Sequence, residues 1–429
     1  MNLKRTLLAL CVLACCTGSI SGQSQPKTKQ REDAGFSPER LDRLARFFQG
    51  EIDRGGIPGA VLLVTRENKL AYLQALGYQD REKHLPMKTD AIFRIASMTK
   101  PVTSVAAMML AEEGKIDLLA PVSQYLPEFK DVKVGVENPN AGKTAISLED
   151  AQQAMTVQDL LRHTSGLVYG PFGNTLVHQA YNKANLFDNS QTLAEFVTKL
   201  SKLPLAHQPG KVWEYGMSTD VLGRIVEVVS GMPFDRFVEE RITKPLGMHD
   251  TGFYLTAAEA PRLAELQVDP STGKRPGANS RENLTKEKQK WISGGGGLLS
   301  TASDYGRFCQ MLLNGGELNG VRLLSPQTIA LMSSDHLPPG ILRSGYEDMA
   351  PTPEMGQSFG LGFAVRTDGG RNPLPGSVGT YYWAGAYGTY FWIDPQAKMF
   401  AVMMVQMPFP QSGYYRRAFR ELVYGALVH

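Results

Sequence analysis

A serine and a lysine three residues apart, Ser97 and Lys100 in "RIASMTKPV", have a spacing that could support chemistry. In a helix, side chains at positions i and i+3 lie on the same face. Pro101 follows, and because proline is tolerated in the first turn of a helix, it places Ser97 at the helix N-terminus. The free N–H groups and the helix dipole there favour a serine oxyanion and disfavour a protonated lysine. The pair therefore predicts a nucleophilic serine with a lysine base.

The alternative is an ordinary helix start. In that interpretation Ser97 is a plain N-cap and Lys100 extends its amine to solvent. The helix that follows, as far as Glu113, is apolar nearly all round, which predicts that it lies in the middle of the protein. Burial disfavours the charged form of a lysine, so this pattern supports the role of a base.

A second serine, Ser358 in "GQSFG", matches GxSxG, the nucleophile elbow of α/β-hydrolases. That elbow needs a helix after the serine, and then an acid and a histidine later in the chain. The segment after Ser358 is glycine-rich and strand-like, and the only later histidine is His429. We therefore expect Ser358 in a glycine-containing loop that runs into a strand.

The sequence implies no metal and no organic cofactor. The histidines are scattered without an HExxH motif, and there is no CxxC pair, Walker lysine motif or GxGxxG after a strand. "GGGG" at 294–297 predicts a tight backbone turn. The net charge of +3 includes Lys4 and Arg5, so it gives no argument for nucleic acid or an anionic membrane.

The N-terminus predicts export. Lys4 and Arg5 precede the apolar run "TLLALCVLACC", and the small residues "TGSISGQ" follow, as in a signal peptide. We expect residues 1–22 to be removed and the protein to be periplasmic or secreted. Two alternatives are an uncleaved anchor, for which the run is short, and a lipoprotein attached at Cys15, which would be its only membrane association.

Capping residues and apolar periodicity predict the elements that position the pair. Residues 23–34 are polar and are expected to form a disordered linker. Ser37 and Pro38 begin a helix, and 59–80 is typical of a β-hairpin with its turn near Glu67-Asn68.

Strand signals at both ends of the chain predict one catalytic unit over 35–429. An α/β subdomain would comprise about 35–96 and 318–429, and a mainly helical subdomain would be inserted over about 97–317. Cys309, in a helical apolar context, is expected to be a small core residue.

Five segments extend this pattern: "FRIASMTKPVTSVAAMMLAEEGKIDLLAPVSQYLPEF", "TVQDLLRHTSGL", "WEYGMSTDVLGRIVEVVSG", "GGGGLLSTASDYGRFCQMLLNGG" and "YYWAGAYGTYFWIDP". They resemble the serine β-lactamase-like and penicillin-binding-protein superfamily, in its class C-like branch, and most of all the family VIII carboxylesterases. The resemblance covers about 35–428. It implies an α/β (α+β) fold of the β-lactamase/transpeptidase-like type, with a central antiparallel sheet flanked by helices and an inserted mainly helical domain.

The resemblance also implies roles for single residues. Ser97 corresponds to the acylated nucleophile and Lys100 to its partner base. Tyr215, in "WEYGMS", corresponds to the tyrosine of the Y-x-N motif, which can accept the serine proton and pass it to the leaving group. The alternative for Tyr215 is an aromatic residue packed beside Trp213. The backbone N–H groups of Ser97 and Ala386 correspond to the oxyanion hole.

Two departures from the family pattern favour esters over β-lactams. Met217 replaces the asparagine of Y-x-N, and methionine cannot bond a β-lactam amide. "WAG" at Trp383 to Gly385 replaces Lys-Thr-Gly or His-Thr-Gly on the strand that lines the site. The cation that holds a β-lactam carboxylate is thereby lost, while Trp383 offers an apolar face to an acyl or alcohol group. Trp383 could instead be a core residue.

These features predict a serine hydrolase that forms an acyl-enzyme, acting as a carboxylesterase on small or short-acyl esters. Ser97, Lys100 and Tyr215 would be catalytic, and Trp383 and Gly385 would bind substrate. One alternative is a β-lactamase or D-alanyl-D-alanine carboxypeptidase, which would take an amide or lactam. Another is a catalytically silent ligand-binding protein of the same fold.

Overall fold

The computed structural model describes residues 25–137, 146–269, 273–275, 283–344, 353–407 and 412–428. The expected signal peptide, including Cys15, lies outside these ranges. Within them, no helix combines the length and apolar character that a membrane span requires.

A large antiparallel sheet joins the two ends of the chain. Within the described ranges its strand order is β12-β13-β14-β15-β16-β1-β2-β3. Its strands are β1 (Gly59–Arg66), β2 (Lys69–Asp80), β3 (Leu85–Pro86), β12 (Gln357–Phe359), β13 (Ala364–Arg366), β14 (Tyr381–Ala384), β15 (Tyr390–Asp394) and β16 (Met399–Val405). β1 pairs with β16, so that Ala60 lies opposite Val405. The prediction of one sheet built from both ends of the chain is confirmed.

The β1–β2 hairpin forms at the predicted turn. Glu67 and Asn68 both have positive φ angles, 50° and 61°, as a two-residue turn that matches the strand twist requires.

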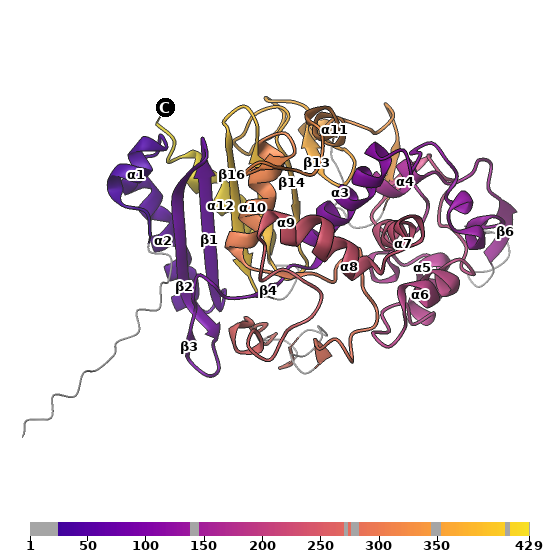
Figure 1. Ribbon diagram of the computed structural model, residues 1–429, viewed down its shortest axis with the longest axis horizontal. Helices are drawn as coiled ribbons and strands as arrows, with labels where there is room; N and C mark the ends of the chain where they lie inside the picture. Colours follow the sequence, from indigo (N-terminus) through magenta and orange to yellow (C-terminus); the bar gives the residue numbers. More distant parts are fainter. Residues whose placement is uncertain are drawn as a thin grey trace, which may run out of the picture.

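Helices cover both faces of the sheet. Successive residues of a strand point to opposite faces, so Ala60 and Leu62 share one apolar cluster while Val61 and Leu63 belong to another. α2 (Pro38–Asp53) and α12 (Ser412–Tyr424) cover the first face, and α10 (Ala302–Leu313) covers the second. Figure 1 shows the sheet on the left, the helical part on the right and α3 (Thr99–Glu112) between them. The β-lactamase-like architecture predicted above is therefore present.

Two helices that follow α3 begin at threonine caps. Thr156 accepts a hydrogen bond from the Asp159 N–H at the start of α4, and Thr301 accepts one from the Asp304 N–H at the start of α10. The remaining helices are α5 (Leu176–Lys183), α6 (Leu193–Leu200), α7 (Ser218–Ser230), α8 (Phe234–Val238), α9 (Lys244–Leu246) and α11 (Pro326–Met332), with α4 at Val157–Leu161. Cys309 in α10 is fully buried, as expected of a core residue.

The segment predicted to be a disordered linker contains a helix instead. α1 (Thr28–Asp33) lies against β2, and its Arg31 is buried. Arg31 donates to the Pro26 carbonyl at 3.1 Å and to Asp42 Oδ1 at 2.7 Å. Both partners lie outside α1. The composition of residues 23–34 carries no information about such partners, so it did not indicate that the segment is ordered.

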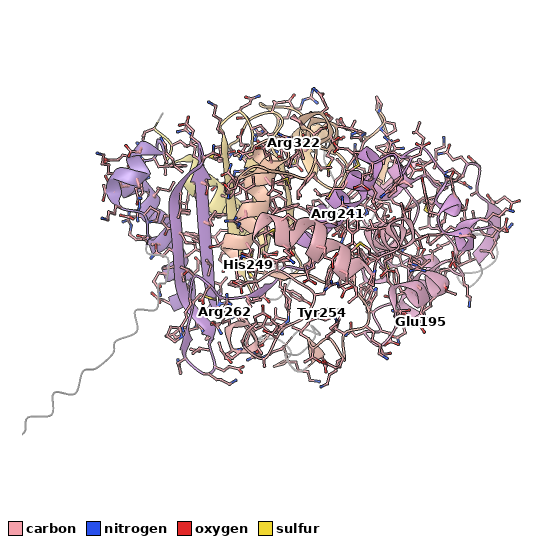
Figure 2. All side chains as sticks on the ribbon, viewed as in Figure 1. Glu195, Arg241, His249, Tyr254, Arg262 and Arg322 are labelled. Atoms are coloured by element: carbon pink, nitrogen blue, oxygen red, sulfur yellow. The ribbon has the colours of Figure 1, made fainter. Side chains whose placement is uncertain are left out.

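Charged side chains are spread over the surface, and some of them tie separate segments together (Figure 2). Arg241 pairs with Glu113 just after α3, and Arg262 pairs with Asp250 at 2.7 Å. Exposed ion pairs of this kind each contribute little to stability. The first joins the segment after α8 to the C-terminal end of α3, and the second joins two points of the chain between α9 and β8 (Leu299–Ser300).

Candidate active site

Ser97 lies in a short 3-10 helix, η1 (Ala96–Met98), directly before α3. Pro101 is the third residue of α3, which is the position that the sequence predicted from its tolerance of proline. Ser97 is partly exposed, whereas Lys100 is only 2% exposed. A substrate can therefore reach the serine while the lysine amine stays enclosed by protein.

The backbone around Ser97 is strained and tightly held. Ala96 has a φ of 45°, in the left-handed region that side chains rarely adopt. Buried side chains from three other parts of the chain hold the flanking carbonyls: Gln406 Nε2 donates to Arg94 O at 3.1 Å, Thr389 Oγ1 to Ile95 O at 3.2 Å and Tyr305 Oη to Met98 O at 2.9 Å. These contacts fix Ser97 in one place, as the expected role of a nucleophile would need.

Lys100 Nζ has three oxygen partners. They are the Gly295 carbonyl at 2.7 Å, Tyr169 Oη at 3.0 Å and Ser97 Oγ at 3.4 Å. These three oxygens surround the amine nitrogen. The lysine therefore does not extend to solvent as in an ordinary helix start.

Tyr215 contacts Lys100 through its ring and not through its hydroxyl. Lys100 Nζ lies over the ring, 4.6 Å from the centroid. Tyr215 is 3% exposed, and its Oη has no hydrogen-bond partner among the described residues. The structure thus brings Tyr215 to the predicted site, but the phenol that bonds the lysine is Tyr169. Sequence reasoning missed Tyr169, which lies two residues beyond the matching block "TVQDLLRHTSGL".

A buried carboxylate, Asp220, lies behind Lys100 and is linked to it through Gly295. Asp220 Oδ1 accepts hydrogen bonds from Ser293 Oγ at 2.6 Å and from the Gly295 N–H at 3.2 Å. Burial raises the pKa of Asp220, while the positive charge of Lys100 and these two hydrogen bonds oppose that shift. Asp220, Gly295 and Lys100 therefore form one connected network.

Gly385 brings the end of β14 against the residues that precede Ser97. A Cβ at Gly385 would lie 2.3 Å from the Ile95 carbonyl oxygen, so only glycine permits this approach. Ala386 follows in an exposed turn. Within the described part of the chain, the N–H groups of Ser97 and Ala386 have no acceptor. Two free N–H donors on adjoining segments fit the expected oxyanion hole.

Trp383 does not present the apolar face that the sequence suggested. It is 4% exposed, and its ring lies 5.3 Å from Tyr215 and 5.3 Å from Phe359, between ring centroids. The pleat of β14 directs it into the core, which is the alternative considered above. Phe187, 52% exposed, is instead the open aromatic ring near the lysine, stacked 6.3 Å from Tyr169.

Ser358 is not arranged as a nucleophile elbow. It lies in β12, is 5% exposed and donates a hydrogen bond to Asp335. The chain continues into β13 and not into a helix. Ser358 itself therefore lies in a strand and not in the expected loop, and a glycine-containing loop over 360–363 then leads into β13.

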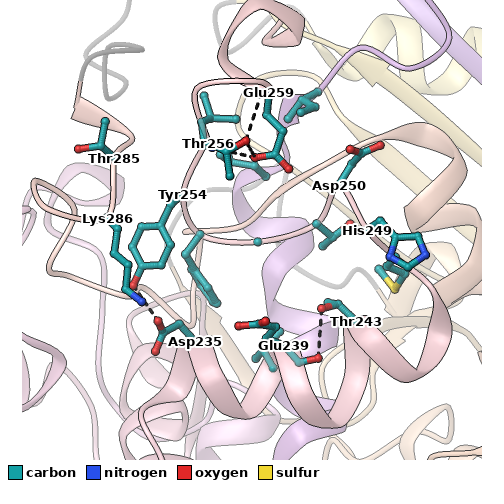
Figure 3. A pocket seen from close by; sticks show the side chains of 18 of the residues that line it. Asp235, Glu239, Thr243, His249, Asp250, Tyr254, Thr256, Glu259, Thr285 and Lys286 are labelled. Atoms are coloured by element: carbon teal, nitrogen blue, oxygen red, sulfur yellow. Dashed lines mark hydrogen bonds between the residues drawn. The ribbon is translucent and has the colours of Figure 1, made fainter.

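A cavity of about 850 Å³ lies between α8 and the loop that follows α9, away from this site (Figure 3). Three of its carboxylates already have partners: Asp235 accepts from Tyr254 at 2.9 Å, Asp250 pairs with Arg262, and Glu259 accepts from the Thr256 N–H at 2.8 Å. None of the predicted site residues lines it. Across the described ranges, no group of three His, Cys, Asp or Glu residues could hold a metal ion.

The sequence model of the Beta-lactamase family matches residues 44–425. The chain belongs to the beta-lactamase family. Protein Rv1367c of Mycobacterium tuberculosis (strain ATCC 25618 / H37Rv) is 38% identical over 370 residues, which cover 85% of this chain and 90% of the relative. The resemblance inferred from the motifs is therefore confirmed.

Other members of the beta-lactamase family that resemble this chain include enzymes named for ester chemistry. Esterase EstB of Burkholderia gladioli is 29% identical over 91% of this chain and 96% of its own length. The solved structure of EstCE1, described as a hydrolase with promiscuous acyltransferase activity, superposes with a TM-score of 0.73. It shares 28% identity and covers 90% of this chain and 99% of its own. The fold predicted for this family member is therefore confirmed.

Proposed function

We propose that this protein is a serine hydrolase that acts as a carboxylesterase on small or short-acyl esters, through an acyl-enzyme on Ser97. The observation that carries the proposal is the placement of the enclosed Lys100 amine 3.4 Å from Ser97 Oγ. A lysine in its neutral form accepts the serine proton in such a pair. The esterase EstB and the hydrolase EstCE1, among the relatives, support the same reaction class.

The reaction follows from the positions of these groups. Ser97 Oγ attacks the ester carbonyl carbon while Lys100 takes its proton. The N–H groups of Ser97 and Ala386 stabilise the oxyanion of the tetrahedral intermediate. The bond to the alcohol oxygen then breaks, the alcohol leaves with a proton, and water hydrolyses the acyl-enzyme to a carboxylic acid and free Ser97.

Apolar rings beside the lysine support an ester with an apolar group. Phe172 and Phe187 flank Tyr169, with ring centroids 5.5 Å and 6.3 Å from it. Phe187 is exposed and can contact a bound acyl or alcohol group. Met217, in the place of the family asparagine, is fully buried and offers no amide to a β-lactam.

We also propose that the protein is exported after removal of residues 1–22. The charged and apolar segments of the N-terminus support this location. The mass of the protein recovered from the periplasm or medium, compared with the full-length chain, tests it.

Hydrolysis of p-nitrophenyl butyrate and nitrocefin by the wild type and Ser97→Ala tests the reaction. We expect turnover of the ester, and a loss of about 1000-fold or more in Ser97→Ala. Ser358→Ala is the matched control and keeps its activity. Faster turnover of nitrocefin would identify a β-lactamase. Turnover of neither substrate would contradict the proposed function.

A further inference from the structure

We infer that Arg416 is a positioning residue for the oxyanion hole, because it holds the peptide unit that presents the Ala386 N–H. The inference rests on the proposed esterase reaction at Ser97 and deepens it. Arg416 Nη2 donates a hydrogen bond to the Gly385 carbonyl oxygen at 2.6 Å. Gly385 and Ala386 are joined by the peptide bond that contains both this carbonyl and the expected N–H donor.

The direction of the Ala386 N–H follows from that of the Gly385 carbonyl. A peptide unit is planar and almost always trans, so its C=O and N–H bonds point in opposite directions. A donor that fixes the carbonyl therefore fixes the N–H as well. The Ala386 N–H has no acceptor among the described residues, so this peptide is held by hydrogen bonds at its carbonyl end.

The turn that follows β14 has only one such bond of its own. The Gly388 N–H donates to the Gly385 carbonyl at 3.1 Å. Both ends of that bond are glycines, Gly388 has a φ of 96°, and Ala386 between them is exposed. Glycine restricts the backbone less than other residues do. The bond from Arg416 is shorter, and it is strengthened by the charge of the guanidinium group.

Arg416 extends from a helix that is firmly packed on the sheet. Its neighbours Tyr415 and Phe419 in α12 are buried in the apolar cluster on one face of the sheet. The Phe419 ring lies 5.1 Å from that of Trp392 in β15, between centroids, and Tyr415 Oη donates to Glu51 Oε2 at 3.1 Å. The guanidinium group of Arg416 is thus carried to the turn by an element that is itself fixed.

The charge of Arg416 also acts on the N–H donor. A cation at a carbonyl oxygen polarises the peptide unit, so the N–H at the other end becomes a stronger donor. The gain is largest when negative charge develops on the ester carbonyl oxygen, as it does in the transition state that leads to the tetrahedral intermediate. Binding of the uncharged ester gains little. Loss of Arg416 should therefore lower kcat and leave KM nearly unchanged.

Arg416→Met, which keeps the apolar stem and removes the guanidinium group, tests this role. Arg417→Met, at the exposed next residue of α12, is the control. We expect Arg416→Met to lower kcat for p-nitrophenyl butyrate by about 10- to 100-fold with KM within about 3-fold. Propyl trifluoromethyl ketone adds Ser97 Oγ to its carbonyl carbon and places an oxyanion in the hole, so its affinity should fall by the same factor. Arg417→Met should keep kcat and this affinity within about 2-fold.

The p-nitrophenyl ester of succinic acid, whose acyl group carries a carboxylate, separates positioning from substrate binding. A positioning residue lowers kcat/KM for this ester and for the butyrate by the same factor, within about 3-fold. A loss confined to the succinate ester would show that Arg416 binds a substrate anion, and would overturn the assignment. So would an unchanged kcat in Arg416→Met, or a fall in kcat without a fall in affinity for the ketone.

Circular dichroism checks the folding of each variant. If Arg416→Met does not fold, Arg416→Ala is assayed with and without added guanidinium ion. Recovery of kcat by the ion supports the assignment, and no recovery contradicts it. Ser97→Ala is assayed alongside. Full activity in Ser97→Ala would remove the proposed function, whereas wild-type activity in Arg416→Met beside an inactive Ser97→Ala would remove only the role of Arg416.

Discussion

The carbonyl oxygen of Gly295 accepts a hydrogen bond from Lys100 Nζ at 2.7 Å. The neighbouring Gly294 carbonyl accepts one from Thr103 Oγ1, also at 2.7 Å. The glycine run at 294–297, expected from the sequence to be a tight turn, therefore lays its backbone directly against α3. It is part of the site and holds the lysine in place.

The glycine run provides a matched pair of variants. A Cβ at Gly295 would lie 2.3 Å from Asp220 Oδ2 and 3.0 Å from Tyr169 Oη, whereas a Cβ at Gly296 would meet no atom closer than 3.9 Å. We expect Gly295→Ala to lower kcat/KM for p-nitrophenyl butyrate by about 100-fold, since displacement of the groups around the lysine disrupts catalysis. Gly296→Ala should stay within about 3-fold. Equal activities in the two variants would contradict the role of Gly295.

From the surroundings of the Glu214 carboxylate we predict that the fold loses stability in acid. Burial would raise the pKa of this carboxyl, but hydrogen bonds from His178 and His207 outweigh it and lower the pKa to about 2. Because the folded pKa lies below the ordinary 4.5, the stabilisation is complete above about pH 4.5 and is lost as the pH falls toward 2. Glu214→Gln should lower the free energy of unfolding at pH 7 by roughly 3 kcal/mol.

Urea unfolding at pH 7 and pH 3 measures this effect. The difference between wild type and Glu214→Gln should be smaller at pH 3 than at pH 7. Glu128→Gln, at an exposed carboxylate, is the control and should change the free energy of unfolding by less than about 0.5 kcal/mol. A difference independent of pH would show that the Glu214 charge does not stabilise the fold.

From the position of Phe187 we predict that its ring contributes to substrate affinity. Its open ring beside Tyr169 can cover an apolar group of the bound ester. We expect Phe187→Ala to raise KM for p-nitrophenyl butyrate by about 5- to 10-fold with little change in kcat, since a ring contact contributes about 1 kcal/mol. Leu148→Ala, at a 60% exposed residue of β6 (Ile146–Asp150), serves as the control. An unchanged KM in Phe187→Ala would place the apolar group elsewhere.

We predict that replacing Ser358 changes the stability of the fold and leaves catalysis unchanged. Ser358 lies on the edge strand β12, and its hydroxyl donates a hydrogen bond to Asp335. Ser358→Ala should lower the free energy of unfolding by about 1 kcal/mol and keep kcat within about 3-fold. A complete loss of activity in a folded Ser358→Ala variant would revive the nucleophile elbow.

Local patterns made much of the fold predictable. The helix start at Ser37 and Pro38 and the hairpin turn at Glu67-Asn68 each depend on a few consecutive residues. The conformational preferences of such residues act over one turn, so a single sequence carries them. The relation between Ser97 and Lys100 is equally local, because one helical turn places both residues on one face.

The sequence by itself indicated Ser97 as a candidate nucleophile, Lys100 as its partner and the elements that carry them. Tertiary structure decided which oxygens surround that lysine. Tyr169 and Gly295 lie 69 and 195 residues from Lys100 along the chain, and only packing brings them to it. It also decided that Trp383 enters the core and that Tyr215 presents its ring. The residue type fixes which chemical groups a side chain has. Which of those groups faces a neighbouring residue depends on how distant elements pack.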